Sequence, residues 1–191
     1  MNINKIKMSK TDYIGRQIIY KNEVESTQSL AKDLVKNDYI YNGTVIITDN
    51  QTKGKGTHGR VWNTSKGKNI TMTIILKPNC DINLLDKLTI QIAEAIKIAI
   101  KELYGYDLII KYPNDLLLNG KKICGILTQS STTKNIVNYI LIGIGFNVNE
   151  ERFPENLKEI ATSLKKEYLN EFNREDIIIK ILKEIEKIMP N

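Results

Sequence analysis

Histidine, cysteine and tryptophan are scarce in this chain of 191 residues, which contains one His, two Cys and one Trp. The cysteines, Cys80 and Cys124, lie far apart and form no C-x-x-C pair, which argues against a disulfide framework, a zinc site or a redox pair. They are expected to be buried or incidental thiols. The lone His58 has no nucleophile paired with it in a recognisable motif, so the sequence predicts no catalytic triad and no metal-ligating cluster.

Long apolar runs are absent as well. Hydrophobic residues make up 41% of the chain, but no stretch approaches the roughly 20 residues that a membrane-spanning helix requires. The segment from Met1 to Lys7 has no apolar core of the kind found in secretory signals. These absences predict a soluble, cytoplasmic protein with no membrane partner.

The balance of charge is basic, with 28 Lys and Arg against 22 Asp and Glu, which gives a formal net charge of +6. We therefore expect an anionic partner. A nucleotide, a nucleic acid and an acidic protein surface are all consistent with this charge. Most lysines in a Lys-rich chain are simply solvated. Only charge that is clustered in the sequence is therefore informative.

The length and the hydrophobic pattern predict one domain over residues 1–191. We expect strands at residues 17–20, 44–48, 70–76, 107–111, 116–118, 123–127 and 139–146, with an Asn119-Gly120 hairpin turn. Ser26 is the expected N-cap of a first helix, apolar residues from Leu84 to Leu103 predict a long helix ended by Gly105, and Ile177 to Ile188 predict a third. Helices set around hairpin-connected strands indicate an α+β fold.

The stretch from Asn50 to Asn69 is an unusually long polar loop, rich in Gly and Lys, and loops of this length are commonly functional. Its residues 54–59 satisfy the G-x-G-x-x-G string of dinucleotide-binding proteins, but no helix follows, and a Walker motif is absent. Three glycines and several cations can still bind phosphates through backbone N–H groups and point charges. A basic surface loop without a ligand is the alternative interpretation.

Residues 51–62 of this loop, Gln51 to Trp62, resemble the glycine-rich loop of biotin protein ligases. Four further segments match that family in order, namely Val24 to Gln28 (Ser-Thr-Asn/Gln), Lys111 to Asp115 (Lys-Trp-Pro-Asn-Asp), Lys121 to Leu127 (Lys-x-x-Gly-Ile-Leu) and Gly143 to Asn147 (Gly-x-Gly-x-Asn). The matches extend over most of the chain. The resemblance implies the family's mixed, largely antiparallel sheet flanked by helices.

The resemblance also implies the reaction. Biotin and ATP, with Mg²⁺, form biotinyl-5′-AMP and pyrophosphate, and a lysine of a biotin carboxyl carrier protein then attacks the activated carbonyl. Ser26, Thr27, Gln28 and Gln51 supply short polar groups for the ureido ring of biotin. Helix capping is the alternative role of Ser26 and Thr27.

Phosphate-binding and catalytic roles follow from the same matches. The loop contributes Gly54, Lys55, Gly56, Thr57 and Arg60, and the family match adds Gly125. Lys122 would stabilise the negative charge that develops at the α-phosphate, and Lys111, which clusters with Asn114 and Asp115 at the Pro113 break, is a further catalytic candidate. Asp115 would act with Mg²⁺ or with the incoming amine, or would only cap the turn. By the same resemblance, Asn114, Asn147 and Trp62 lie on the adenine side of the site. Trp62 would stack on the base, and packing in the core is its alternative role.

Two departures from the family pattern bear on function. Many members have Arg at the position of Thr57, where a guanidinium can close over a phosphate, so retention of the adenylate is expected to be weaker here. Tyr112 also replaces the more usual Trp. The expected domain is the catalytic one alone, with no N-terminal winged helix, no DNA binding and no C-terminal SH3-like domain. The oligomeric state and the particular carrier are left open.

Three other functions are alternatives to the ligase. A lipoate or octanoyl transferase of the same superfamily fits less well, because the basic glycine-rich loop and Lys111 to Asp115 favour biotin. A non-catalytic biotin-binding remnant is suggested by Thr57 and by the absent C-terminal domain. A nucleic-acid-binding module is the weakest alternative, since the cations gather in one loop and not along a base-reading helix.

Overall fold

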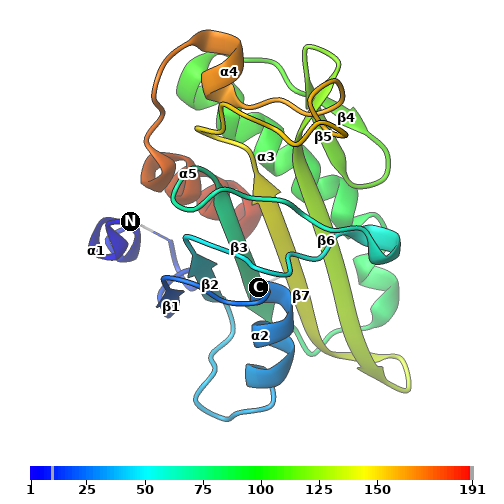
Figure 1. Ribbon diagram of the computed structural model, residues 1–191. Coiled ribbons are helices and arrows are strands. Elements are labelled where there is room, and N and C mark those ends of the chain that lie inside the picture. The colour runs from blue at the N-terminus through cyan, green and yellow to red at the C-terminus, as the bar shows by residue number, and fades with distance from the viewer. Residues whose placement is uncertain (10, 190–191) are drawn as a thin grey trace.

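The sheet contains seven strands in the computed structural model, which describes residues 1–9 and 11–189 (Figure 1). The strands are β1 (Ile18–Lys21), β2 (Thr44–Thr48), β3 (Ile70–Leu76), β4 (Ile109–Lys111), β5 (Asp115–Leu118), β6 (Lys121–Thr133) and β7 (Ile136–Phe146). Their spatial order is β1-β2-β3-β7-β6-β5-β4. Only β1 and β2 pair in parallel, so the expected mixed, largely antiparallel sheet is confirmed.

Helices cover both faces of this sheet. They are α1 (Ile3–Lys7), α2 (Thr27–Leu34), α3 (Leu88–Tyr104), α4 (Leu164–Tyr168) and α5 (Arg174–Ile188), with short 3₁₀ turns at Thr57–Gly59 and Ile82–Leu85. The helices α3 and α5 pack together behind the sheet and share the larger hydrophobic core with it (Figure 1). On the opposite face, α2 covers a smaller core that includes Ile46, Ile75 and Leu141.

Local signals in the sequence explain several element boundaries. Ser26 is the N-cap of α2, and its side chain accepts a hydrogen bond from the backbone N–H of Ser29. Gly105 ends α3 in the left-handed conformation, with φ of 76°. Asn119 and Gly120 both have positive φ, 50° and 78°, as a two-residue hairpin turn requires. These three predictions are confirmed.

Other boundaries differ from the predicted ones. Leu84 and Leu85 do not belong to the long helix, because Lys87 adopts a left-handed conformation and α3 begins only at Leu88. The strands β6 and β7 run further than expected, into a polar hairpin around Lys134. The short helices α1 and α4 were not predicted, since five residues are too few to show a periodic pattern.

Cys124 is buried and Cys80 is partly buried, as expected of thiols without a special role. Burial raises the pKa of the Cys124 thiol, which keeps it protonated. Within residues 1–9 and 11–189, no helix combines the length and the apolar character that crossing a bilayer demands. Lys10, Pro190 and Asn191, which the single-domain assignment also includes, lie outside the described residues.

Candidate active site

A cavity of about 410 Å³ lies on the α2 side of the sheet. Its floor comes from residues 143–145 of β7, and its walls come from α2, the loop between β2 and β3, the start of β6 and the segment after β7. All but one of the sequence-predicted site residues line it: Ser26, Thr27, Gln28, Gln51, Lys55, Gly56, Thr57, Arg60, Trp62, Lys111, Asn114, Asp115, Lys122, Gly125 and Asn147. The fold thus brings together segments that are more than a hundred residues apart.

The exception is Gly54, which is buried behind the cavity wall. A Cβ atom at this position would lie 2.3 Å from the carbonyl oxygen of Trp62. The backbone N–H of Trp62 also donates to the carbonyl of Gly54, at 3.0 Å. Gly54 therefore permits the two arms of the loop to approach each other, and it does not face the cavity.

Uncharged polar groups occupy the end of the cavity next to α2. Gln51 Oε1 accepts hydrogen bonds from the backbone N–H and the hydroxyl of Thr27, at 2.8 and 3.1 Å. The hydroxyl of Thr73 donates to Thr27 Oγ1 at 2.9 Å and to Gln28 Oε1 at 3.2 Å. Because these groups hold one another in place, this end offers short, oriented hydrogen-bonding groups to a neutral polar ligand.

The loop between β2 and β3 folds into a tight turn over the cavity. Lys55 and Val61 face each other in an isolated antiparallel bridge, and the backbone N–H of Gly56 donates to Arg60 O at 2.7 Å. The guanidinium of Arg60 folds back onto Thr57 and donates to its hydroxyl at 3.0 Å and to its carbonyl at 3.3 Å. Thr57 thus holds the cation of Arg60, a role that its sequence position alone does not reveal.

Trp62 lies flat against two facing glycines of the sheet. Gly125 of β6 and Gly145 of β7 are register partners, and a Cβ atom at Gly145 would come within 2.3 Å of the indole. The indole is thus a wall of the cavity and not part of either hydrophobic core. Its Nε1 is buried and has no hydrogen-bond partner among the described residues.

Charged groups gather at the opposite end of the cavity. Lys122 Nζ lies 2.7 Å from Asp115 Oδ1 and 5.5 Å from the centre of the Trp62 ring. Among the described residues no donor is in line with the buried Oδ1, so the attraction between this lysine and the carboxylate is ionic and does not take the form of a well-aligned hydrogen bond. Lys111 is exposed at the end of β4, directly opposite Asp115 in the register. Two lysines and one carboxylate suit a ligand with several negative charges.

The two asparagines make structural contacts at the edge of this region. Asn114 Nδ2 donates to Ile126 O, and Asn147 Nδ2 donates to Thr162 O, both at 3.0 Å. Their oxygens are not engaged in these two bonds, and both side chains line the cavity. Asn147 is 4% exposed, so whatever it contacts in addition has to enter the cavity.

The wall formed by residues 153–161 was missed by sequence reasoning. Phe153, Leu157, Glu159, Ile160 and Ala161 line the cavity. Backbone hydrogen bonds of Lys122 with Ile160 and Thr162 hold this irregular segment beside β6. It has no periodicity that could have identified it. Gly143 and Gly145 were also not predicted to be site residues, although glycines at alternate strand positions are a signal of close approach by another group.

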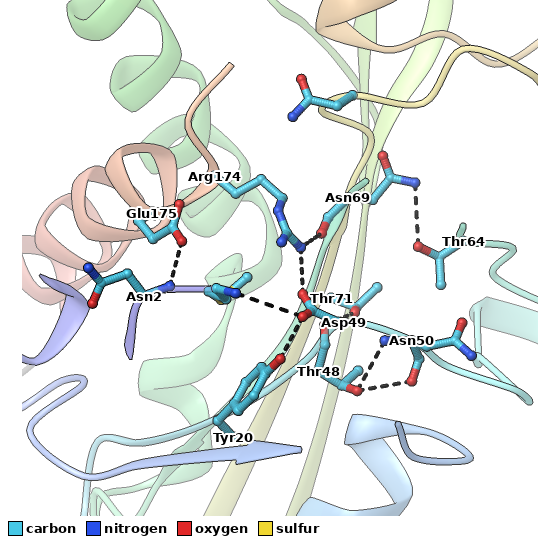
Figure 2. A network of polar contacts seen from close by, with 12 residues as sticks. Asn2, Tyr20, Thr48, Asp49, Asn50, Thr64, Asn69, Thr71, Arg174 and Glu175 are labelled. Atoms are coloured by element: carbon cyan, nitrogen blue, oxygen red, sulfur yellow. Dashed lines mark hydrogen bonds and ion pairs between the residues drawn. The ribbon is translucent and has the colours of Figure 1, made fainter. Parts of the chain in front are cut away.

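A polar network holds the base of the loop, as Figure 2 shows. Asp49 follows β2, and its carboxylate accepts hydrogen bonds from Arg174 at 2.8 Å and from Tyr20 at 2.5 Å. Burial alone raises the pKa of Asp49, but the bonds from Tyr20 and Arg174 outweigh burial and hold that pKa below its ordinary value. The bond to Asp49 raises the pKa of Tyr20 to about 12. Asp49 is therefore charged at neutral pH.

Metal ligands are sparse in the described part of the chain. No three His, Cys, Asp or Glu side chains there lie close enough to hold a metal ion. Asp115 and Glu159 both line the cavity. Mg²⁺ usually binds through one or two carboxylates together with the phosphates of a nucleotide. The residues present therefore fit Mg²⁺ that arrives with ATP, and they do not form a cage for a resident ion.

Known proteins of similar sequence belong to one group. The bifunctional ligase/repressor BirA of Bacillus subtilis is 39% identical over 180 residues, which cover 93% of this chain and 55% of that protein. The biotin–acetyl-CoA-carboxylase ligase of Paracoccus denitrificans is 35% identical over 105 residues, which cover 54% of this chain and 43% of that protein. The chain thus spans about half the length of the curated relatives it matches.

Comparison of the fold with solved structures leads to the same group of proteins. The structure of the biotin protein ligase from Aquifex aeolicus in complex with biotin and ATP superposes with a TM-score of 0.77 at 29% identity, over 91% of this chain and 70% of that one. The family model described as biotin/lipoate A/B protein ligase matches residues 20–147, a segment that contains all the sequence-predicted site residues. The chain belongs to the biotin/lipoate A/B protein ligase family.

Proposed function

We propose that this chain activates biotin with ATP to give biotinyl-5′-AMP and then transfers biotin to a lysine of a biotin carboxyl carrier protein. The observation that carries the proposal is the polarity of this cavity: neutral hydrogen-bonding groups at Thr27, Gln28 and Gln51, and charged groups at Lys122 and Asp115. Biotin has a neutral ureido ring at one end and a carboxylate at the other. The volume of about 410 Å³ is also in the usual range for a small-molecule site.

The first half-reaction needs positive charge where the biotin carboxylate meets the α-phosphate of ATP. An oxygen of the carboxylate attacks phosphorus, the bond to the β-phosphate oxygen breaks, and pyrophosphate leaves with the electron pair. Lys122 is the group that we assign to the developing negative charge, because its Nζ lies between Asp115 and Trp62 on the cavity wall. Lys111 and Arg60 add cations at the cavity mouth.

Mg²⁺ belongs to the nucleotide substrate in this proposal, and it shields the phosphates. Asp115 is the carboxylate that we assign to holding this ion when it is bound, and Asp115 also pairs with Lys122. In the second half-reaction the carrier lysine attacks the acyl carbon and AMP leaves. Asp115 is the candidate to hold the incoming amine. The roles of Asp115 toward Mg²⁺ and toward the amine belong to different half-reactions and do not exclude each other.

The relatives favour biotin over lipoate, since the Paracoccus denitrificans ligase and the Aquifex aeolicus structure are both named for biotin. The carrier assignment has support from the name of the Paracoccus denitrificans ligase. The Bacillus subtilis relative is a repressor as well as a ligase. We propose only the ligase activity for the described residues, because their clustered cations surround the cavity. A non-catalytic biotin-binding protein is the second candidate, suggested by Thr57.

The test combines the protein with MgATP, an apo carrier domain and either biotin, lipoate or octanoate, and measures pyrophosphate release and carrier mass. Pyrophosphate release and a gain in carrier mass with biotin alone are expected. Release without a gain in mass would contradict the transfer step. Biotin binding by calorimetry with no release would favour the non-catalytic protein, and activity only with lipoate or octanoate would overturn the substrate assignment.

A further inference from the structure

The loop from Asn50 to Asn69 contributes much of the cavity wall but has little hydrophobic anchorage of its own. Lys55, Arg60 and Val61 are exposed, and neither hydrophobic core includes a residue of the loop. Apart from the packing of Trp62 against Gly125 and Gly145, its position over the cavity therefore depends on polar contacts within the turn and at the base. The contacts at the base of the loop, where its two ends meet, involve a residue that does not line the cavity.

That residue is Arg174, the first residue of α5 (Figure 2). Its Nη1 donates to Asp49 Oδ1 at 2.8 Å and to the carbonyl of Asn69 at 3.1 Å. Asp49 immediately precedes the loop and Asn69 ends it. One nitrogen atom of one side chain thus contacts both ends of the loop.

The network continues from Asn69 into the returning arm of the loop. Asn69 Nδ2 donates to Thr64 Oγ1 at 3.4 Å and to Glu150 Oε2 at 3.0 Å, and Glu150 Oε2 also accepts from the backbone N–H of Ser65. The N–H of Gly67 donates to the carbonyl of Asp49. Residues 64–69 are therefore fixed through the same cluster that Arg174 completes.

The location of Arg174 is not explained by helix stability. A cation at the first position of a helix faces the positive end of the helix dipole, where acidic residues such as Glu175 and Asp176 are favoured. The side chains of Arg174 and Asp49 are only 11% and 15% exposed, so the pair is largely shielded from water. The contacts to Asp49 and Asn69 account for a cation at this place.

The sheet does not depend on these contacts to form. The strand β2 is paired with β3 along its whole length, with Thr48 opposite Thr71, and this pairing brings the two ends of the loop together without Arg174. The buried apolar face of α5, from Ile177 to Ile185, holds that helix against α3. Loss of the Arg174 side chain should therefore alter the loop more than the fold.

We propose that Arg174 and Asp49 are positioning residues, which fix the base of the loop so that its backbone N–H groups and Arg60 face the nucleotide phosphates. This inference rests on the proposed function for the identity of the ligand. It predicts that weakening the pair raises the KM for ATP more than it lowers kcat, because the group that we assign to the chemistry, Lys122, lies on β6. It also predicts a change in the loop that is detectable without any substrate.

The experiment compares Arg174→Met, Arg174→Lys and Lys180→Met with the parent chain. Lysine at position 174 can replace Nη1, because a single nitrogen makes both contacts. Lys180 is the matched control: it lies on the same helix and is paired with Glu102 and Glu184, but it does not contact the loop. Limited trypsin digestion without ligand measures cleavage after Lys53, Lys55, Arg60 and Lys66, with Lys134 in the β6–β7 turn as an internal reference.

Arg174→Met is expected to speed cleavage in the loop by about tenfold over Lys180→Met, with cleavage at Lys134 unchanged, since proteolysis follows the population of open states. Arg174→Lys should restore most of the protection. Equal loop cleavage in Arg174→Met and Lys180→Met, or a parallel rise at Lys134, would overturn the proposal. Absence of pyrophosphate release in the parent chain would refute the proposed function but would leave the digestion result decisive for the loop.

Discussion

Lys122 shows how the surroundings of one residue change its interpretation. The sequence describes it only as a lysine after a hairpin turn, which is usually a solvated residue. In the structure its ammonium lies beside Asp115 and above the Trp62 ring. Its neighbour Lys121 instead lies 4.0 Å from Glu159, outside that pair. Two adjacent lysines of the same strand therefore provide a test of the catalytic assignment.

Replacement of Lys122 by Ala should lower the rate of adenylate formation on the order of a hundredfold, as expected for loss of one preorganised charge. Lys121→Ala should retain most of the rate. The pair with Asp115 is partly solvated, at 32% and 16% exposure, so its loss should cost at most about 1 kcal/mol of unfolding free energy. Pyrophosphate release and thermal melting measure the two effects. A Lys122→Ala rate above a tenth of the parent rate would refute the assignment.

Thr57 allows a second test with a single residue. If its hydroxyl retains the adenylate less well than a guanidinium would, biotinyl-5′-AMP should escape and label lysines of an unrelated protein. Thr57→Arg should then reduce that labelling roughly tenfold, since a charge-assisted contact contributes about 1.5 to 3 kcal/mol. Val61→Arg, which adds the same charge at a side chain that is 66% exposed, is the control.

The hydrogen bond from Arg60 to the hydroxyl of Thr57 suggests a different result of this test. Equal and negligible labelling by the parent chain and by Thr57→Arg would mean that Arg60, held by Thr57, already closes the site. Thr57, by holding Arg60, would then do the work of the family's arginine, and retention of the adenylate would not be impaired.

At the scale of elements, the facing glycines of β6 and β7 determine where Trp62 lies. Gly125 and Gly145 are paired in the register, and the indole occupies the space that their side chains would need. Gly143, two residues earlier on the same face, approaches Gln28 instead. Two glycines of one strand thus make room for different parts of the site.

Gly145→Ala should move the indole away from the sheet, because the new Cβ would overlap it, whereas Gly143→Ala should disturb only Gln28. Trp62 is the only tryptophan in the chain, so its fluorescence emission reports this change without a label. Emission of Gly145→Ala should shift to longer wavelength, and that of Gly143→Ala should resemble the parent. A shift of equal size in both variants would contradict the packing described for Trp62.

Elements with strong local signals were predictable. Continuous apolar strands such as β2 and β3, the cap at Ser26 and the turn at Asn119 follow from short-range chemistry, and they appear where the sequence places them. The predicted start of the long helix at Leu84 was wrong, and α3 begins at Leu88. The apolar periodicity continues through Leu84 and Leu85 and does not reveal the left-handed conformation of Lys87. Hydrophobic periodicity shows which face of an element is buried, but it does not show where the backbone conformation changes.

At the scale of the whole molecule, the site exists only because the sheet order places distant segments side by side. The loop after β2, the start of β6 and the end of β7 converge on one cavity. The resemblance to a family identifies these residues in the sequence, but it does not show which of them contact one another. The wall at residues 153–161 and the contact of Arg174 with Asp49 depend on tertiary packing, which leaves no pattern in a single sequence.

The central claim is that this cavity joins biotin to the α-phosphate of ATP. It is tested most directly by the exchange of labelled pyrophosphate into ATP in the absence of any carrier, because exchange requires reversible formation of the adenylate. We expect exchange that depends on biotin and Mg²⁺ and that falls on the order of a hundredfold in Lys122→Ala but not in Lys121→Ala. No biotin-dependent exchange by a folded parent protein that binds both biotin and ATP would contradict the claim.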